Sequence, residues 1–131
     1  MKPRMLLVTL AAVVASGCAT QPPTIARPDQ ECKGKCQIEV ESTGDIVPRK
    51  VFVTGGAGEE IRWKIRPWFV HFTDVDGIQF DDRDGGTSVF TRCGRDGWRE
   101  FVCINSGKTG EYKYTVRLLG STPFDPWVVN R

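Results

Sequence analysis

Three stretches of the chain alternate apolar and polar residues with a period of two. In each stretch the apolar side chains take every second position, as Trp63 does between Arg62 and Lys64. The stretches are 37–41, 61–66 and 111–118. Successive side chains of a strand point to opposite faces, so this alternation predicts strands with one buried and one wet face, which is typical of antiparallel sheets. No window of ten residues carries a helical stripe of apolar side chains.

Turn-forming pairs rich in Gly and Asp separate these stretches and bound several shorter ones. The shorter candidate strands are 50–54, 69–73, 87–92, 98–103 and 127–130. Seven or eight short strands with turns between them predict an all-β fold, a small antiparallel β-sandwich.

Composition limits the classes of function that the chain can serve. A length of 131 residues allows one compact domain, and 18 basic against 16 acidic residues give no charge pattern for binding nucleic acid. A single histidine excludes metal sites built from several imidazoles. No nucleophile motif and no glycine-rich phosphate loop is present, so we expect no enzyme, no catalytic residue and no cofactor.

The N-terminus has the pattern of an export signal. Lys2 and Arg4 precede an apolar stretch at 5–15, which is too short to span a bilayer as a helix. The sequence Ala-Ser-Gly before Cys18 resembles the lipobox of bacterial lipoproteins. The resemblance implies cleavage after residue 17, lipidation of Cys18 and a place in the bacterial cell envelope. The alternative is an ordinary cleavage site next to a chance cysteine.

The segment after Cys18 differs in composition from the rest of the chain. Residues 18–31 contain three prolines, which disfavour helix and sheet, and we expect them to form a tether that holds a domain at 32–131 off the membrane. Removal of residues 1–17 takes away two basic residues and leaves a neutral chain. Ala19 follows the lipidated position, and by resemblance to enterobacterial lipoproteins it implies sorting to the outer membrane, facing the periplasm.

Four further cysteines remain for the domain: Cys32, Cys36, Cys93 and Cys103. An even number of thiols in a small exported domain predicts disulfides. Proximity in sequence favours the pairs Cys32–Cys36 and Cys93–Cys103. In a simple hairpin, however, Cys93 does not face Cys103, and a bond from Cys32 or Cys36 to Cys103 stays open. Lys33 and Lys35 would favour thiolate if the first pair were instead a redox or metal-binding dithiol.

Most of residues 36–130 resembles the cupredoxin family. In 60–72, a strand with a central aromatic residue leads to His71, and Phe101-Val-Cys103 followed by a loop and the strand 112–118 resembles the ending of that family. The resemblance implies a cupredoxin-like β-sandwich with His71 and Cys103 at two copper-ligand positions. An immunoglobulin-like sandwich is the alternative.

The rest of a blue-copper site has no counterpart in the chain. Such a site needs a second imidazole and commonly a methionine. The loop after Cys103 contains neither, and both methionines precede the cleavage position. We therefore expect the scaffold without a type 1 copper site, and His71 with Cys103 remains a weak candidate for another metal site.

Five carboxylates lie close together in sequence, and they are Asp74, Asp76, Asp81, Asp82 and Asp84. Carboxylate oxygens can bind Ca²⁺, but the spacing lacks the order of an EF-hand loop. Asp next to Gly is also the usual composition of turns, and turns are the interpretation that we favour.

The remaining candidates are aromatic. Trp68 follows Arg66-Pro67, and an exposed tryptophan beside arginine can stack on a sugar ring or an apolar patch of a partner. The simpler interpretation packs Trp68, Trp98 and Trp127 beneath loops. We expect His71 on the strand 69–73, near one end of the sandwich, and Trp68 with His71 as a possible binding surface.

These patterns together favour a lipid-anchored envelope protein that serves as a non-catalytic binding or structural module. Its expected partners are the membrane, through Cys18, and an envelope protein or a glycan. The alternatives are periplasmic copper handling through Cys and His residues, and an enzyme or enzyme inhibitor.

Overall fold

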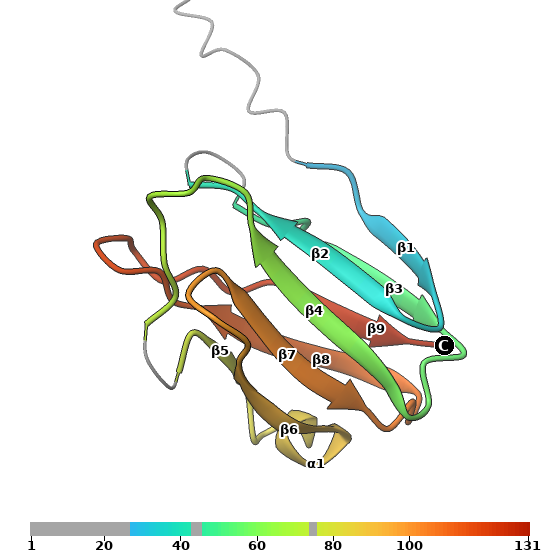
Figure 1. Cartoon of the computed structure of the whole chain (residues 1–131). Coiled ribbons are helices and arrows are strands. Elements are labelled where there is room, and N and C mark those ends of the chain that lie inside the picture. Colours follow the sequence, from blue (N-terminus) through green and yellow to red (C-terminus); the bar gives the residue numbers. More distant parts are fainter. Residues whose placement is uncertain (1–26, 43–45, 74–75) are drawn as a thin grey trace, which may run out of the picture.

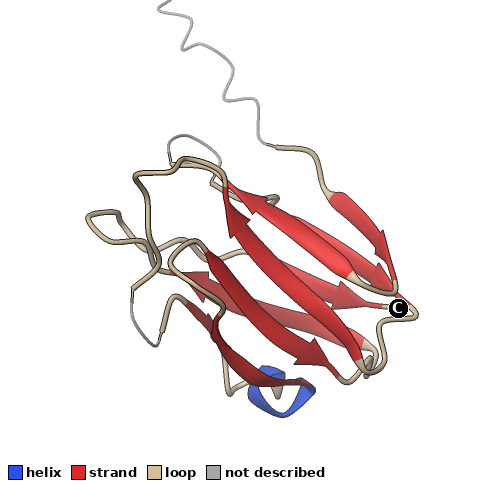
Figure 2. Cartoon of the chain, viewed as in Figure 1, coloured by secondary structure: helices blue, strands red, loops and turns tan. Residues whose placement is uncertain are grey.

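The computed structural model describes residues 27–42, 46–73 and 76–131. In these residues nine strands form two packed sheets, and one short helix lies at the bottom of the view (Figures 1 and 2). The elements are β1 (Gln30–Lys33), β2 (Cys36–Val40), β3 (Lys50–Thr54), β4 (Glu59–Ile65), β5 (Ile78–Phe80), α1 (Gly86–Val89), β6 (Phe90–Arg95), β7 (Glu100–Asn105), β8 (Gly110–Val116) and β9 (Trp127–Asn130). The predicted small all-β sandwich is therefore confirmed.

The two sheets are mixed rather than purely antiparallel. Their strand orders are β1-β3-β9-β8-β5 and β2-β4-β7-β6. The pairs β1–β3, β2–β4 and β3–β9 are parallel, and the other four pairs are antiparallel. The first four strands alternate between the two sheets. β1 therefore pairs with β3, and β2 pairs with β4, in both cases in the same direction. Alternation of apolar and polar residues indicates which face of a strand is exposed to solvent. It does not indicate whether the neighbouring strand runs parallel or antiparallel.

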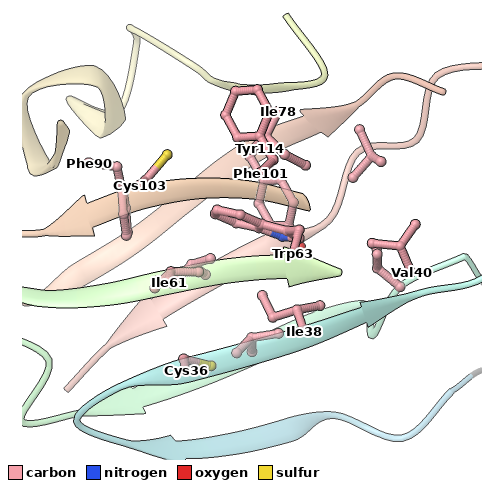
Figure 3. Packing of buried hydrophobic residues seen from close by; sticks show 14 of the residues in the cluster. Cys36, Ile38, Val40, Ile61, Trp63, Ile78, Phe90, Phe101, Cys103 and Tyr114 are labelled. Carbon is pink, nitrogen blue, oxygen red and sulfur yellow. The ribbon is translucent and has the colours of Figure 1, made fainter. Parts of the chain in front are cut away.

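The predicted alternation is visible in the burial of the strands. β2 and β4 bury every second side chain, and β7 and β8 do the same. Trp63 lies at the centre of the core, with its ring 6.1 Å from that of Phe80 and 5.4 Å from that of Tyr114 (Figure 3). Burial of an aromatic side chain of this size stabilises the fold by about 2–3 kcal/mol.

Two polar atoms in this core have no hydrogen-bond partner. Among the described residues these buried side-chain atoms are Nε1 of Trp63 and the hydroxyl oxygen of Tyr114. Burial raises the pKa of Tyr114 above its ordinary value, because the charged phenolate would lie in the apolar core. The phenol therefore stays neutral well into the alkaline range.

The disulfides are the two pairs favoured by proximity in sequence. Cys32–Cys36 joins β1 to β2 and so links the two sheets at one edge. Cys93–Cys103 joins β6 to β7. In β6, Thr91 faces Ile104 and Gly94 faces Val102, so two residues oppose Cys103 in a β-bulge. The bulge shifts the register by one residue and brings Cys93 opposite Cys103, which a regular hairpin does not do.

Two of the predicted strands are wrong in whole or in part. Residues 69–73 form a loop in which only Phe72 makes an isolated bridge, to Leu118, because Pro67 begins a turn that is closed by the N–H of Val70. The predicted strand 87–92 begins three residues later, at Phe90. Gly85 has a φ of 81° and starts the single helical turn α1, which occupies 86–89.

The N-terminal boundary also differs from the expected one. β1 begins at Gln30, so the last two residues assigned to the tether pair with β3. Cys18 and most of the tether lie outside the described residues. Within the described part of the chain, no helix is long and apolar enough to cross a membrane.

Candidate binding surface at the loop end

Several connections between strands gather at one end of the sandwich, away from the C-terminus (Figure 1). Three of these segments lie wholly within the described residues: 66–73 after β4, 96–99 between β6 and β7, and 117–126 between β8 and β9. We call these three segments the loop end. The first and third are joined by backbone hydrogen bonds, from the N–H of Leu119 to the carbonyl of His71 and from the N–H of Thr73 to the carbonyl of Arg117.

The large apolar side chains that are exposed among the described residues all lie at the loop end. The exposed fractions are 78% for Trp68, 64% for Phe69, 70% for Trp98 and 63% for Leu119. The packed interpretation of Trp68 and Trp98 is therefore wrong, whereas Trp127 is half-buried at the start of β9. Phe69 is exposed beside Trp68, with ring centroids 5.8 Å apart, because both lie in a turn instead of on a strand.

An open pocket lies between the three segments. It measures about 320 Å³ and is lined by His71, Phe72, Arg95, Trp98 and Leu119. The ring of His71 meets the ring of Trp98 edge-on at 5.2 Å. The structure thus brings His71 next to Trp98, a neighbour that the sequence did not indicate.

The other proposed copper ligand is not in this pocket. Cys103 is buried in β7 and bonded to Cys93, so it offers no thiolate in this form of the protein. No group of three or more His, Cys, Asp or Glu residues in the described ranges is arranged to hold a metal ion.

The acidic segment forms turns. Oδ1 of Asp81 accepts the N–H of Arg83, and the two carboxylate oxygens of Asp84 accept the N–H groups of Gly86 and Lys113. Oδ1 of Asp76 accepts the hydroxyl of Thr73. Asp74 lies outside the described residues. The turn interpretation therefore accounts for three of these carboxylates, and Asp84 also joins α1 to β8.

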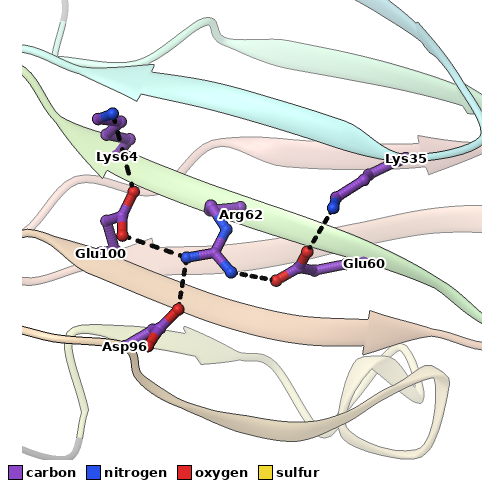
Figure 4. A network of polar contacts seen from close by, with 6 residues as sticks. All are labelled: Lys35, Glu60, Arg62, Lys64, Asp96 and Glu100. Carbon is purple, nitrogen blue, oxygen red and sulfur yellow. Dashed lines mark hydrogen bonds and ion pairs between the residues drawn. The ribbon is translucent and has the colours of Figure 1, made fainter.

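A polar network on the outer face of the second sheet holds the turn that carries Trp98 (Figure 4). Arg62 at its centre donates to Asp96 at 2.6 Å, to Glu100 at 3.2 Å and to Glu60. Lys35 and Lys64 extend the network as ion pairs with Glu60 and Glu100. Asp96 lies two residues before Trp98, so Arg62 ties the 96–99 turn to β4.

The charges of this network shift the pKa values of its members. The hydrogen bond to Asp96 raises the pKa of Arg62, against the opposing effect of partial desolvation. Desolvation acts to raise the pKa of Glu60, but the hydrogen bonds and charges of Lys35 and Arg62 outweigh it, so this pKa lies below its ordinary value. Both groups are therefore ionised at neutral pH.

Sequence reasoning found part of this surface. It singled out Trp68 and His71, and it named Trp98 without favouring its exposure. It placed Phe69 on the predicted strand 69–73 instead of in an exposed turn. It missed Leu119, which follows an alternating stretch and has the local sequence of a strand residue. No protein-family model matches the sequence, and no curated protein matches it.

Proposed function

We propose that this protein is a lipid-anchored bacterial envelope protein and a non-catalytic binding module, and that the loop end is its binding surface. One observation carries the proposal: Trp68, Phe69, Trp98 and Leu119 expose most of their surface, and all lie on three neighbouring loops. Scattered exposed apolar residues need no explanation, but large ones gathered on loops of a rigid scaffold are typical of binding surfaces.

The way in which these loops are held supports the same role. The 66–73 and 117–126 segments are joined by backbone hydrogen bonds, and the 96–99 turn is tied down through Arg62 and Asp96. A surface that is held in place before binding loses less conformational entropy when it binds. The loops that carry Trp68 and Trp98 are therefore held in place before a partner binds.

The export pattern at the N-terminus and the disulfides support the location. Cysteine pairs such as Cys32–Cys36 and Cys93–Cys103 persist in oxidising compartments, among them the bacterial periplasm. The lipidation of Cys18 and the sorting to the outer membrane rest on the sequence resemblance. Copper handling is the weaker candidate, because it needs thiolates and would first require reduction of these disulfides.

The test is photo-crosslinking in living cells. Trp98 is replaced by a photoreactive phenylalanine analogue in the full chain, and the matched control carries the analogue at Lys108. Lys108 is exposed and lies between β7 and β8, at the opposite end of the sandwich. We expect irradiation to give a crosslinked product, to protein, glycan or lipid, at position 98 and none at position 108. No product at position 98, or the same products at both positions, would refute the proposal.

A further inference from the structure

The place where the chain enters the sandwich bears on what the loop end contacts. Arg27 is the first described residue, and its Nη1 donates to the carbonyls of Glu39 at 2.7 Å and Ile46 at 3.0 Å. Glu39 lies near the end of β2 and pairs with Lys64, just before the 66–73 segment. Arg27 therefore lies at the same end of the sandwich as the loop end.

The length of the tether keeps that end near the bilayer. Arg27 lies nine positions after Cys18, with eight residues between them. Even a fully extended chain spans only about 3.3–3.6 Å per residue, so Arg27 stays within about 30 Å of a lipidated Cys18. An anchor at Cys18 thus keeps the loop end within reach of the membrane surface.

The residue types at the loop end match the chemistry of a membrane interface. Tryptophan is enriched at the level of the lipid headgroups, where its ring meets both apolar chains and water. Trp68 and Trp98 are exposed there together with Phe69 and Leu119, and arginines flank them at 66 and 99. Arginine side chains can place an apolar stem along lipid while the guanidinium meets phosphate.

We infer that the loop end docks on the surface of the bilayer that holds the lipid anchor, with Trp68 and Trp98 at headgroup depth. This inference rests on the proposed function, and it names the partner of the same surface. A weak contact is enough, because the anchor converts docking into an intramolecular event at high effective concentration. The consequence is orientation: the sandwich stands with its loop end toward the membrane and its opposite end toward the periplasm.

The experiment uses the mature lipidated protein in vesicles of phosphatidylethanolamine and phosphatidylglycerol that contain brominated lipid, which quenches tryptophan on contact. Trp63 is fully buried in the core and Trp127 is half-buried, so the exposed Trp68 and Trp98 are the expected reporters. The matched control is the triple variant Trp68→Phe, Trp98→Phe, Lys108→Trp, which moves an exposed indole to the opposite end.

We expect brominated lipid to reduce the fluorescence of the wild-type protein severalfold more than that of the control. Equal quenching of the two proteins, or no quenching of either, would overturn the inference. The vesicles contain no glycan and no other protein. A crosslink from position 98 to a protein or glycan, together with absent quenching, therefore rejects the bilayer as partner and leaves the binding module intact. Absence of any crosslink at position 98 rejects the binding module itself.

Discussion

At the scale of single residues, exposure separates the tryptophans into different roles. Trp63 is enclosed by the core, whereas Trp68 and Trp98 expose most of their surface. All three stand next to charged or proline residues in the sequence, so local composition did not distinguish them. The alternation of apolar and polar residues identified Trp63 as a core residue, because residues 61 and 65 are also apolar and are buried. No such period surrounds the two exposed residues.

Cys18 is the residue on which the proposed location depends. In the variant Cys18→Ser no thiol is available for acylation, so we expect the protein to lose incorporated palmitate and to leave the membrane fraction. Metabolic labelling and fractionation of the envelope measure both effects. Thr20→Ala is the control and should behave like the wild type. A Cys18→Ser protein that remains membrane-bound and labelled would contradict lipidation at this position.

Tyr114 gives the fold a dependence on alkaline pH. Burial raises its pKa in the folded state above the value of about 10 that holds in the unfolded chain. The stability that this tyrosine contributes is therefore complete below pH 10 and is lost as the pH rises further. We expect its share to decline by up to about 1.4 kcal/mol per pH unit.

Urea unfolding across the alkaline range measures this share against the variant Tyr114→Phe. The variant lacks the titrating group, so its free energy of unfolding should fall less steeply with pH than that of the wild type. All other groups are the same in the two proteins, so their contributions cancel in the comparison. Equal slopes for the two proteins would mean that Tyr114 is not buried as described.

At the scale of elements, the sequence predicted the longer strands that bury one face. β2, β4 and β8 coincide closely with the alternating stretches, and β9 coincides with the predicted 127–130. β1 was missed because its residues follow a proline-rich segment. β5 was missed because it has only three residues. Pairing direction and the bulge in β6 depend on neighbours distant in sequence, and no local pattern reports them.

The candidate site was less predictable than the fold, because it too depends on residues that are distant in sequence. His71 meets Trp98 across a gap of 27 positions, and Leu119 joins them from a third loop. Each of these residues has an ordinary local sequence. Their proximity arises only when β4, β7 and β8 lie with their loop-bearing ends together, so the sequence indicated candidates and could not assemble them.

The two disulfides should differ in their contribution to stability. Cys93–Cys103 closes a longer loop than Cys32–Cys36, with sequence separations of 10 and 4. If chain entropy of the unfolded state dominates, the longer loop stabilises by about 0.7 kcal/mol more. Each pair contains a cysteine that is fully buried, at positions 36 and 103, so replacement by alanine leaves comparable space.

Urea unfolding of the variants Cys32→Ala/Cys36→Ala and Cys93→Ala/Cys103→Ala tests this order. Both variants should be less stable than the wild type, and the second should be the less stable of the two. The intact mass of the oxidised wild-type domain should lie four protons below that of its reduced form. A wild-type mass with free thiols would contradict the pairing and would revive copper handling as the function to test.

At the scale of the whole molecule, the two ends of the sandwich have different surfaces. The loop end carries the exposed aromatic residues and receives the tether, whereas the opposite end has the turns at 55–58 and 106–109 and the C-terminus. Residues 55–58 and 106–109 contain no aromatic side chain. Among the described residues, this asymmetry is the clearest indication of which end makes contacts.

Hydrogen–deuterium exchange tests most directly whether the loop end is the surface of contact. The lipidated protein in isolated envelope membranes is compared with the Ala19–Arg131 chain in solution, which retains every described strand and the whole described core. The account predicts slower exchange at 66–73, 96–99 and 117–126, and unchanged exchange at 55–58 and 106–109. Slower exchange at the opposite end, or no difference at the loop end, would contradict it.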